Sequence, residues 1–144
     1  MLYQLFIGSL ITMISLMGGS LMSWLLNEAL LRIEPWLRQS PHHLKSLIVV
    51  FMAAIATMCM IAFGVWLWAI VFERMAVFST WEEAVYYSLV AYTTLGLGDV
   101  VVPEERRLLG GMTGANGFLM FGFMTALLTD TLRYVRRVQR GEQR

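Results

Sequence analysis

The 144-residue sequence predicts an all-α integral membrane protein, with three transmembrane helices and one shorter helix that enters the membrane without crossing it. Of its residues, 58% are hydrophobic and 15% charged, and its mean hydropathy is +0.63, whereas about a quarter of the residues in soluble domains are charged. Three apolar runs are long enough to cross a hydrocarbon core of about 30 Å, which takes about 20 helical residues. A fourth apolar stretch, residues 84–92, is too short to cross and is expected to be re-entrant.

The first run, residues 2–26, carries no charge and predicts an N-terminal transmembrane helix within residues 1–26. It does not fit a cleaved signal peptide, because no basic residue precedes it, it is too long for an h-region and it lacks an A-x-A site. Ser15, Gly19 and Ser23 recur every four residues, a pattern suited to close helix packing. We therefore expect a retained helix that packs against other helices.

Residues 27–46 mix apolar side chains with charges and predict a cytoplasmic linker at the membrane interface. Pro35 and Pro41 are expected to break this segment, and Trp36 is expected to lie at the level of the lipid headgroups.

The second and third runs, residues 47–72 and 108–132, predict two further membrane-spanning helices, followed by a basic cytoplasmic tail at residues 136–144. Eight of the 11 lysines and arginines lie in the linker or after residue 132, and three lie between residues 73 and 107. Because basic residues accumulate on the cytoplasmic side, we expect a multi-pass protein of the cell membrane with its N-terminus outside and its C-terminus inside.

The segment between these two runs begins with a helix-start signal. Thr80 with Glu83, or Ser79 with Glu82, fits a capping box and predicts a helix at residues 81–92. The irregular stretch "TTLGLGDV", residues 93–100, follows at membrane depth. Backbone of this kind is tolerated there only where it is buried in protein or lines a watery path, so its carbonyls need partners.

Residues 47–135 resemble the pore unit of the potassium-channel superfamily: outer helix (47–72), pore helix (81–92), a T-x-G-Y-G-D-like filter (94–99) and inner helix (108–132). The resemblance implies a potassium-selective channel, in which rings of backbone carbonyls replace the water shell of the ion. It assigns ion binding to Thr94 (carbonyl and hydroxyl), Leu95, Gly96, Leu97 and Gly98, with K⁺ held at the first four. Glycines alternate there because carbonyls that all face one way require φ values that L-residues resist.

The resemblance also implies that Asp99 braces the mouth of the filter against Tyr86, with a solvated loop acid that only adds negative potential as the alternative. The chain departs from the family at Leu97, where relatives carry a tyrosine whose hydroxyl ties the filter to the pore helices. The usual Trp-Trp pair is replaced by Tyr86 and Tyr87, and Val90 stands where some relatives carry an acid. We expect packing to hold the filter more than hydrogen bonds do, with either softer selectivity or ready collapse of the filter as a consequence.

One chain supplies one filter loop and shows no internal repeat, so a ring around an ion predicts a homotetramer. The expected partners are membrane lipid and further copies of the chain, with K⁺ as the permeant ion and no other cofactor. A net charge of +1 without a basic stripe argues against a nucleic-acid partner.

In the inner helix, Asn116 is expected to face a cavity below the filter, with an interhelical hydrogen bond as the alternative. Gly117 lies near the position of a hinge glycine in relatives, although close packing explains it equally well. Asp130 is expected to pair with Arg133. No span carries an arginine at every third position, which argues against a voltage sensor. The 12 residues after Leu132 are too few for a ligand-binding domain.

Two other functions fit the sequence less well. A non-selective cation channel would share this architecture, and a non-conducting membrane scaffold would share the helices but has no need of the T-x-G-x-G-D pattern. An enzyme is not expected, because the chain shows no catalytic triad pattern, no metal-ligand cluster and no dinucleotide-binding context.

Overall fold

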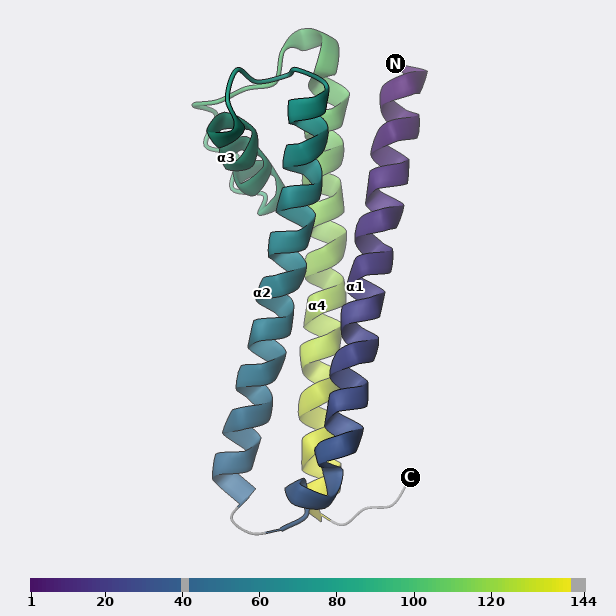
Figure 1. Cartoon of the computed structure of the whole chain (residues 1–144), viewed down its shortest axis with the longest axis vertical. Coiled ribbons are helices and arrows are strands. Elements are labelled where there is room, and N and C mark those ends of the chain that lie inside the picture. The colour runs from purple at the N-terminus through teal and green to yellow at the C-terminus, as the bar shows by residue number, and fades with distance from the viewer. Residues whose placement is uncertain (40–41, 141–144) are drawn as a thin grey trace.

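Three long helices lie side by side, and a short helix is attached near one end (Figure 1). The computed structural model describes residues 1–39 and 42–140. The elements are α1 (Leu2–Leu37), α2 (His42–Arg74), α3 (Trp81–Tyr92), the 3₁₀ turn η1 (Glu104–Arg106) and α4 (Arg107–Arg140). The described residues contain no strand, and three helices are long and apolar enough to cross a membrane. The predicted all-α membrane fold is confirmed.

The short helix α3 does not extend along the full bundle. Its 12 residues span about 18 Å at 1.5 Å per residue, less than the hydrocarbon core of about 30 Å. The N-terminus, α3 and the start of α4 lie at one end of the molecule, and the end of α1, the start of α2 and the end of α4 lie at the other (Figure 1). We call these the filter end and the linker end.

The long helices extend further than the sequence predicted. Helix α1 continues to Leu37, whereas the prediction ended the first helix at residue 26, and α4 continues to Arg140. The break expected at Pro35 is wrong, because Pro35 lies inside the last turn of α1. The helix ends at Leu37 and is capped by Arg38, whose backbone N–H donates to the Glu34 carbonyl at 3.2 Å. The break expected at Pro41 lies outside the described residues.

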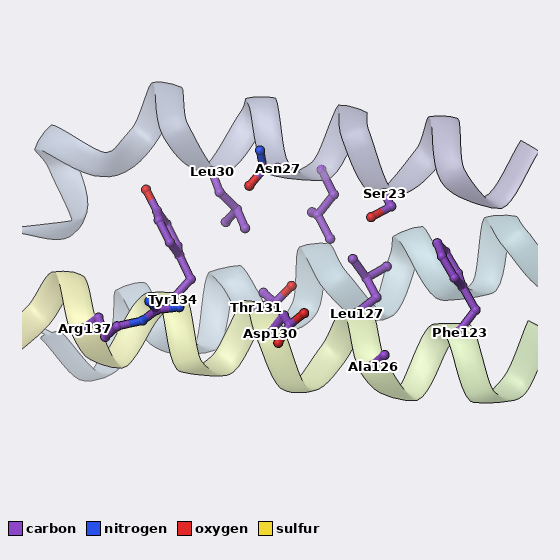
Figure 2. Close-up of a pocket in the computed structure, with 11 residues that line it drawn as sticks. Ser23, Asn27, Leu30, Phe123, Ala126, Leu127, Asp130, Thr131, Tyr134 and Arg137 are labelled. Carbon is purple, nitrogen blue, oxygen red and sulfur yellow. The ribbon is translucent and has the colours of Figure 1, made fainter. Parts of the chain in front are cut away.

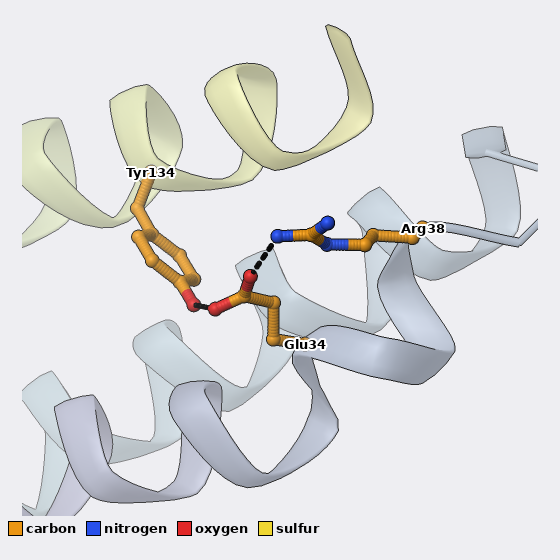
Figure 3. A network of polar contacts seen from close by, with 3 residues as sticks. All are labelled: Glu34, Arg38 and Tyr134. Atoms are coloured by element: carbon orange, nitrogen blue, oxygen red, sulfur yellow. Dashed lines mark hydrogen bonds and ion pairs between the residues drawn. The ribbon is translucent and has the colours of Figure 1, made fainter. Parts of the chain in front are cut away.

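Contacts with the other helices hold this last turn in place. The Glu34 carboxylate accepts hydrogen bonds from the Tyr134 hydroxyl of α4 at 2.7 Å and from Arg38 at 2.6 Å (Figure 3). Lys45 of α2 donates to the carbonyls of Trp36 and Gln39 at 2.5 and 2.7 Å. Tertiary anchoring of this kind outweighs the intrinsic cost of a proline near a helix end.

Two apolar clusters form the core. One lies toward the filter end and includes Trp68, Phe72, Tyr92 and Leu109, and the other lies toward the linker end and includes Leu30, Leu37 and Val135. Between α1 and α4 a cavity of about 410 Å³ opens, with Ser23, Asn27, Asp130 and Tyr134 among the residues that line it (Figure 2).

Candidate functional site

Helix α3 begins with the predicted cap. The Thr80 hydroxyl accepts a hydrogen bond from the Glu83 backbone N–H at 3.2 Å, and the Glu83 carboxylate accepts one from the Ser79 N–H at 3.0 Å. Of the two expected pairings, the structure thus shows the Thr80–Glu83 one. The capped N-terminus faces the filter end, so the C-terminus, which carries partial negative charge, points toward the middle of the bundle. A cation placed there is stabilised.

An aromatic cluster fastens α3 to α2. The Tyr87 ring packs edge-on against Phe72, with ring centroids 5.3 Å apart, and lies 5.1 Å from the Phe78 ring. Phe72 also packs against Trp68 at 5.8 Å. These large rings bury much apolar area, so they fix both the position and the tilt of α3.

In the segment after α3, residues 94–98, the first three N–H groups are paired and the carbonyls are open. The Thr94 N–H donates to the Ala91 carbonyl at 3.0 Å, and the N–H groups of Leu95 and Gly96 donate to the Val90 carbonyl at 3.0 and 3.3 Å. Among the described residues, none of the carbonyls of residues 94–98 accepts a hydrogen bond. Because unpaired carbonyls are costly at membrane depth, this segment requires an external partner for them.

The backbone of this segment alternates in handedness. φ is +59° at Thr94, +59° at Gly96 and +80° at Gly98, and neither Leu95 nor Leu97 has positive φ. Alternating signs of φ turn successive carbonyls toward the same side of the chain. Glycine adopts positive φ without cost, whereas Thr94 adopts it against the usual preference of an L-residue. This alternation predicts a row of carbonyl oxygens along residues 94–98, which we call the carbonyl row, and carbonyl oxygens are ligands that suit a cation.

Tyr86 and Asp99 are brought together as expected. The Tyr86 hydroxyl donates to the Asp99 carboxylate at 2.5 Å and so ties the end of residues 94–99 to α3. This hydrogen bond raises the pKa of Tyr86 above its ordinary value and, with the N–H groups of Asp99 and Val100 contributing, lowers the pKa of Asp99. Both shifts favour the pair of a neutral phenol and an ionised carboxylate.

The apolar side chains of this segment project away from the chain. Leu95 is 63% exposed, Leu97 is 59% exposed and Val101 is 69% exposed. Beside them lies a hollow of about 430 Å³, lined in part by Val90 and Gly96. Apolar side chains exposed so fully next to an open hollow form a surface suited to contact with lipid or with another protein chain.

Helix α4 lies against the end of α3 through two glycines. A Cβ at Gly117 would overlap the carbonyl oxygen of Tyr92, and a Cβ at Gly114 would lie 3.4 Å from that of Ala91. Helix α4 is one uninterrupted helix through both positions. Close packing, the alternative given for Gly117, therefore accounts for this glycine, while the hinge role remains a prediction.

Asn116 is buried within the single chain, and its expected role facing a cavity stays a prediction. The side chain is 0% exposed, since it lies on the face of α4 that packs into the bundle. Neither amide atom has a hydrogen-bond partner among the described residues, so the alternative, an interhelical hydrogen bond, is not formed there either.

A different face of α4 is exposed. Its members recur at intervals of three and four residues, the spacing of one helix face; they are Ala115, Phe118, Gly122, Thr125, Thr129, Arg133 and Arg136. This exposed stripe lies opposite the buried positions Thr131 and Val135 of the same helix. The ion pair expected between Asp130 and Arg133 does not form among the described residues, so Arg133 leaves its charge on the stripe.

The sequence did not single out Tyr92, the residue directly before the stretch at residues 93–100. Tyr92 is completely buried, and its hydroxyl lies 3.4 Å from the Ser15 hydroxyl of α1. The spacing of Ser15 and Gly19 indicated a packing face on α1, but periodicity alone does not identify the partner of such a face.

The comparisons with known proteins agree with this geometry. A family profile described as ion channel matches residues 47–134, which include α2 from residue 47, α3, the carbonyl row and α4 to Tyr134. Neither the curated proteins nor the solved structures contain a match to the chain.

Proposed function

The chain belongs to this ion channel family, and we propose that it is a potassium-selective channel through which K⁺ flows passively. The alternation of φ at Thr94, Gly96 and Gly98 carries the proposal, because it aligns carbonyl oxygens for which the chain itself offers no donor.

We propose that these carbonyls bind the ion. The oxygens of Thr94, Leu95, Gly96 and Leu97 would form successive sites, the Thr94 hydroxyl would complete the innermost one, and Gly98 would let the chain turn outward. A dehydrated K⁺ recovers from these oxygens the coordination that it loses on leaving water. The negative end of the α3 dipole adds to the attraction.

The proposed channel is a homotetramer. One chain provides carbonyls on one side of an ion only, and four copies around an axis close the ring. A neighbouring copy would also cover Leu95, Leu97 and Val101, which one chain leaves exposed. Those side chains would then pack behind the carbonyl row and stiffen it.

In this tetramer the exposed stripe of α4 would face the central path. The members of the stripe from Ala115 to Thr129 are small, apolar or hydroxyl-bearing, and Arg133 and Arg136 follow them toward the linker end. Asn116 would contribute to packing behind this surface, since it points into the bundle.

The proposed location is the cell membrane, with the linker end in the cytoplasm. The arginines of the last turns of α4, Lys45 of α2 and Arg32 and Arg38 of α1 gather at that end, as the positive-inside rule requires. The filter end and the N-terminus would then face outward.

Ion flux from liposomes tests the proposal. With purified protein and outward gradients of K⁺ or Na⁺, we expect flux that favours K⁺ and is blocked by barium. Gly96→Ala places a Cβ on a residue with φ +59° and should abolish this flux, whereas Gly111→Ala, a helical position with nothing within 4 Å, should not. Equal fluxes of the two ions would identify a non-selective channel, the outcome that the missing hydroxyl at Leu97 favours. No flux from either variant or from the parent protein would indicate a scaffold.

A further inference from the structure

Tyr92 reaches from the end of α3 across the bundle to α1. Its side chain is 0% exposed, as is that of Ser15, and the two hydroxyl oxygens lie 3.4 Å apart. A Cβ at Gly64 of α2 would overlap the Tyr92 ring, so this glycine provides the cleft through which the ring passes. Gly117 of α4 contacts the backbone carbonyl of Tyr92. Three long helices thus enclose one residue.

Tyr92 is the last residue of α3 and lies two positions before Thr94, where the carbonyl row begins. Its neighbours Val90 and Ala91 accept the N–H groups of Thr94, Leu95 and Gly96. A displacement of Tyr92 therefore moves the acceptors that hold the inner half of the carbonyl row. Rotation of the ring is prevented on one side by α2, and its hydroxyl is directed by α1.

Helix α1 lies outside residues 47–134, the part of the chain that matches the ion channel family. Its contacts with α4 include two zones. Near the filter end, Gly8 and Gly19 lie against Met112 and Met120 of α4, and near the linker end Glu34 bonds to Tyr134. The cavity of about 410 Å³ separates these zones (Figure 2). Ser15 belongs to the first zone, where its hydroxyl contacts that of Tyr92.

We propose that α1 is a positioning element of the filter, and that the Ser15–Tyr92 hydrogen bond sets how strictly the channel distinguishes K⁺ from Na⁺. The proposal rests on the proposed function. Carbonyls that hold K⁺ at its preferred distance must resist contraction around the smaller Na⁺, and the fixed end of α3 supplies that resistance. Without the hydroxyl of Ser15, the buried Tyr92 hydroxyl has no partner and the ring shifts to find one.

The test compares Ser15→Ala, Tyr92→Phe and the double variant in the full-length protein. Ser9→Ala serves as the matched control, since Ser9 is exposed on the same helix. The measured quantity is the ratio of K⁺ to Na⁺ flux. Loss of folded protein lowers both fluxes in proportion and leaves the ratio unchanged, so a change in the ratio reports on the filter.

We expect Ser15→Ala to lower the ratio about threefold, the effect of an average interhelical hydrogen bond in a membrane. The flux ratio of the double variant should differ from that of the parent protein by no more than the ratio of Ser15→Ala does. The reason is that Tyr92→Phe removes the hydroxyl that Ser15→Ala leaves without a partner. Ratios in all variants equal to that of Ser9→Ala would overturn the inference and leave the proposed function intact. A double variant whose change in flux ratio is the sum of the changes in the two single variants would also overturn the inference.

Deuterium uptake by residues 93–99 provides a readout that needs no conduction. Uptake should be faster in Ser15→Ala than in Ser9→Ala, since the N–H groups of residues 94–96 depend on the end of α3. Equal uptake would refute the coupling even in a protein that conducts. If the parent protein fails to conduct, the proposed function falls, and the uptake still decides whether α1 positions this segment.

Discussion

Substituting Gly117 by alanine perturbs the contact between α4 and the end of α3. A Cβ at this position lies 2.6 Å from the carbonyl carbon of Tyr92 and 3.0 Å from its Cα, and closer still to the carbonyl oxygen. These are backbone atoms, so no side-chain rotation relieves the overlap, and α4 must move away from α3.

The cost follows from two opposing effects. Alanine in place of glycine stabilises a helix interior by about 1 kcal/mol. Overpacking of a core costs about 1–3 kcal/mol, and because the added Cβ meets fixed backbone we expect Gly117→Ala to cost about 3 kcal/mol. After the helix gain is subtracted, the free energy of unfolding should fall by roughly 2 kcal/mol. At about 4 °C per kcal/mol, the melting temperature should fall by roughly 8 °C.

Gly122→Ala is the matched control. It makes the same substitution in the same helix, but nothing lies within 4 Å of a Cβ there. We expect the control to melt at or slightly above the temperature of the parent protein, with tryptophan fluorescence of the detergent-solubilised protein as the assay. Equal melting temperatures for the two variants would refute the packing role of Gly117, and altered gating without loss of stability would indicate the hinge instead.

Four further outcomes are expected. Tyr86→Phe should shorten the time for which flux persists in low K⁺, because the Asp99 carboxylate loses its phenol donor; unchanged persistence would exclude a brace. The Tyr86–Asp99 hydrogen bond should be lost as pH falls through the lowered pKa of Asp99, below 3.8, and as pH rises through the raised pKa of Tyr86, above 10.0. A pH profile of flux that is identical in the parent protein and in Tyr86→Phe would contradict this role of the hydrogen bond. Thr80→Ala removes the acceptor of the Glu83 N–H and should cost about 1 kcal/mol of stability in thermal melts, with Ser79→Ala close to neutral. Arg133→Gln should raise K⁺ flux about twofold in low salt and have no effect near 1 M salt, because charges are screened within about 3 Å there. A change in flux that does not depend on salt would place Arg133 away from the ion path.

Local signals predicted α3 correctly. The cap at Thr80 and Glu83 and the run of helix-forming residues define bounds of 81–92, which are those of the structure, because the interactions responsible are all close in sequence. The contact of Tyr86 with Asp99 was expected from the resemblance, and the hydrogen bond at 2.5 Å agrees with it.

Contacts between distant residues explain what the sequence did not predict. Pro35 was expected to break a helix, but Glu34 beside it is held by Tyr134, 100 residues further along the chain. Asn116 was expected to face a cavity because an amide in a membrane span needs a polar partner or water. The packing of α4 on the bundle decides which of its faces is buried, and Asn116 lies on that face. Tyr92 has no local pattern that would reveal its path between helices to Ser15.

Four copies of residues 94–97 are proposed to bind K⁺ with their backbone carbonyls. Crystals of the purified protein grown in K⁺ and in the heavier Rb⁺ would test this directly through anomalous diffraction. We predict a tetramer with a column of Rb⁺ peaks on its fourfold axis, level with the carbonyls of Thr94, Leu95, Gly96 and Leu97. A protein without fourfold symmetry, or a tetramer whose axis holds no ion at these carbonyls, would contradict the claim.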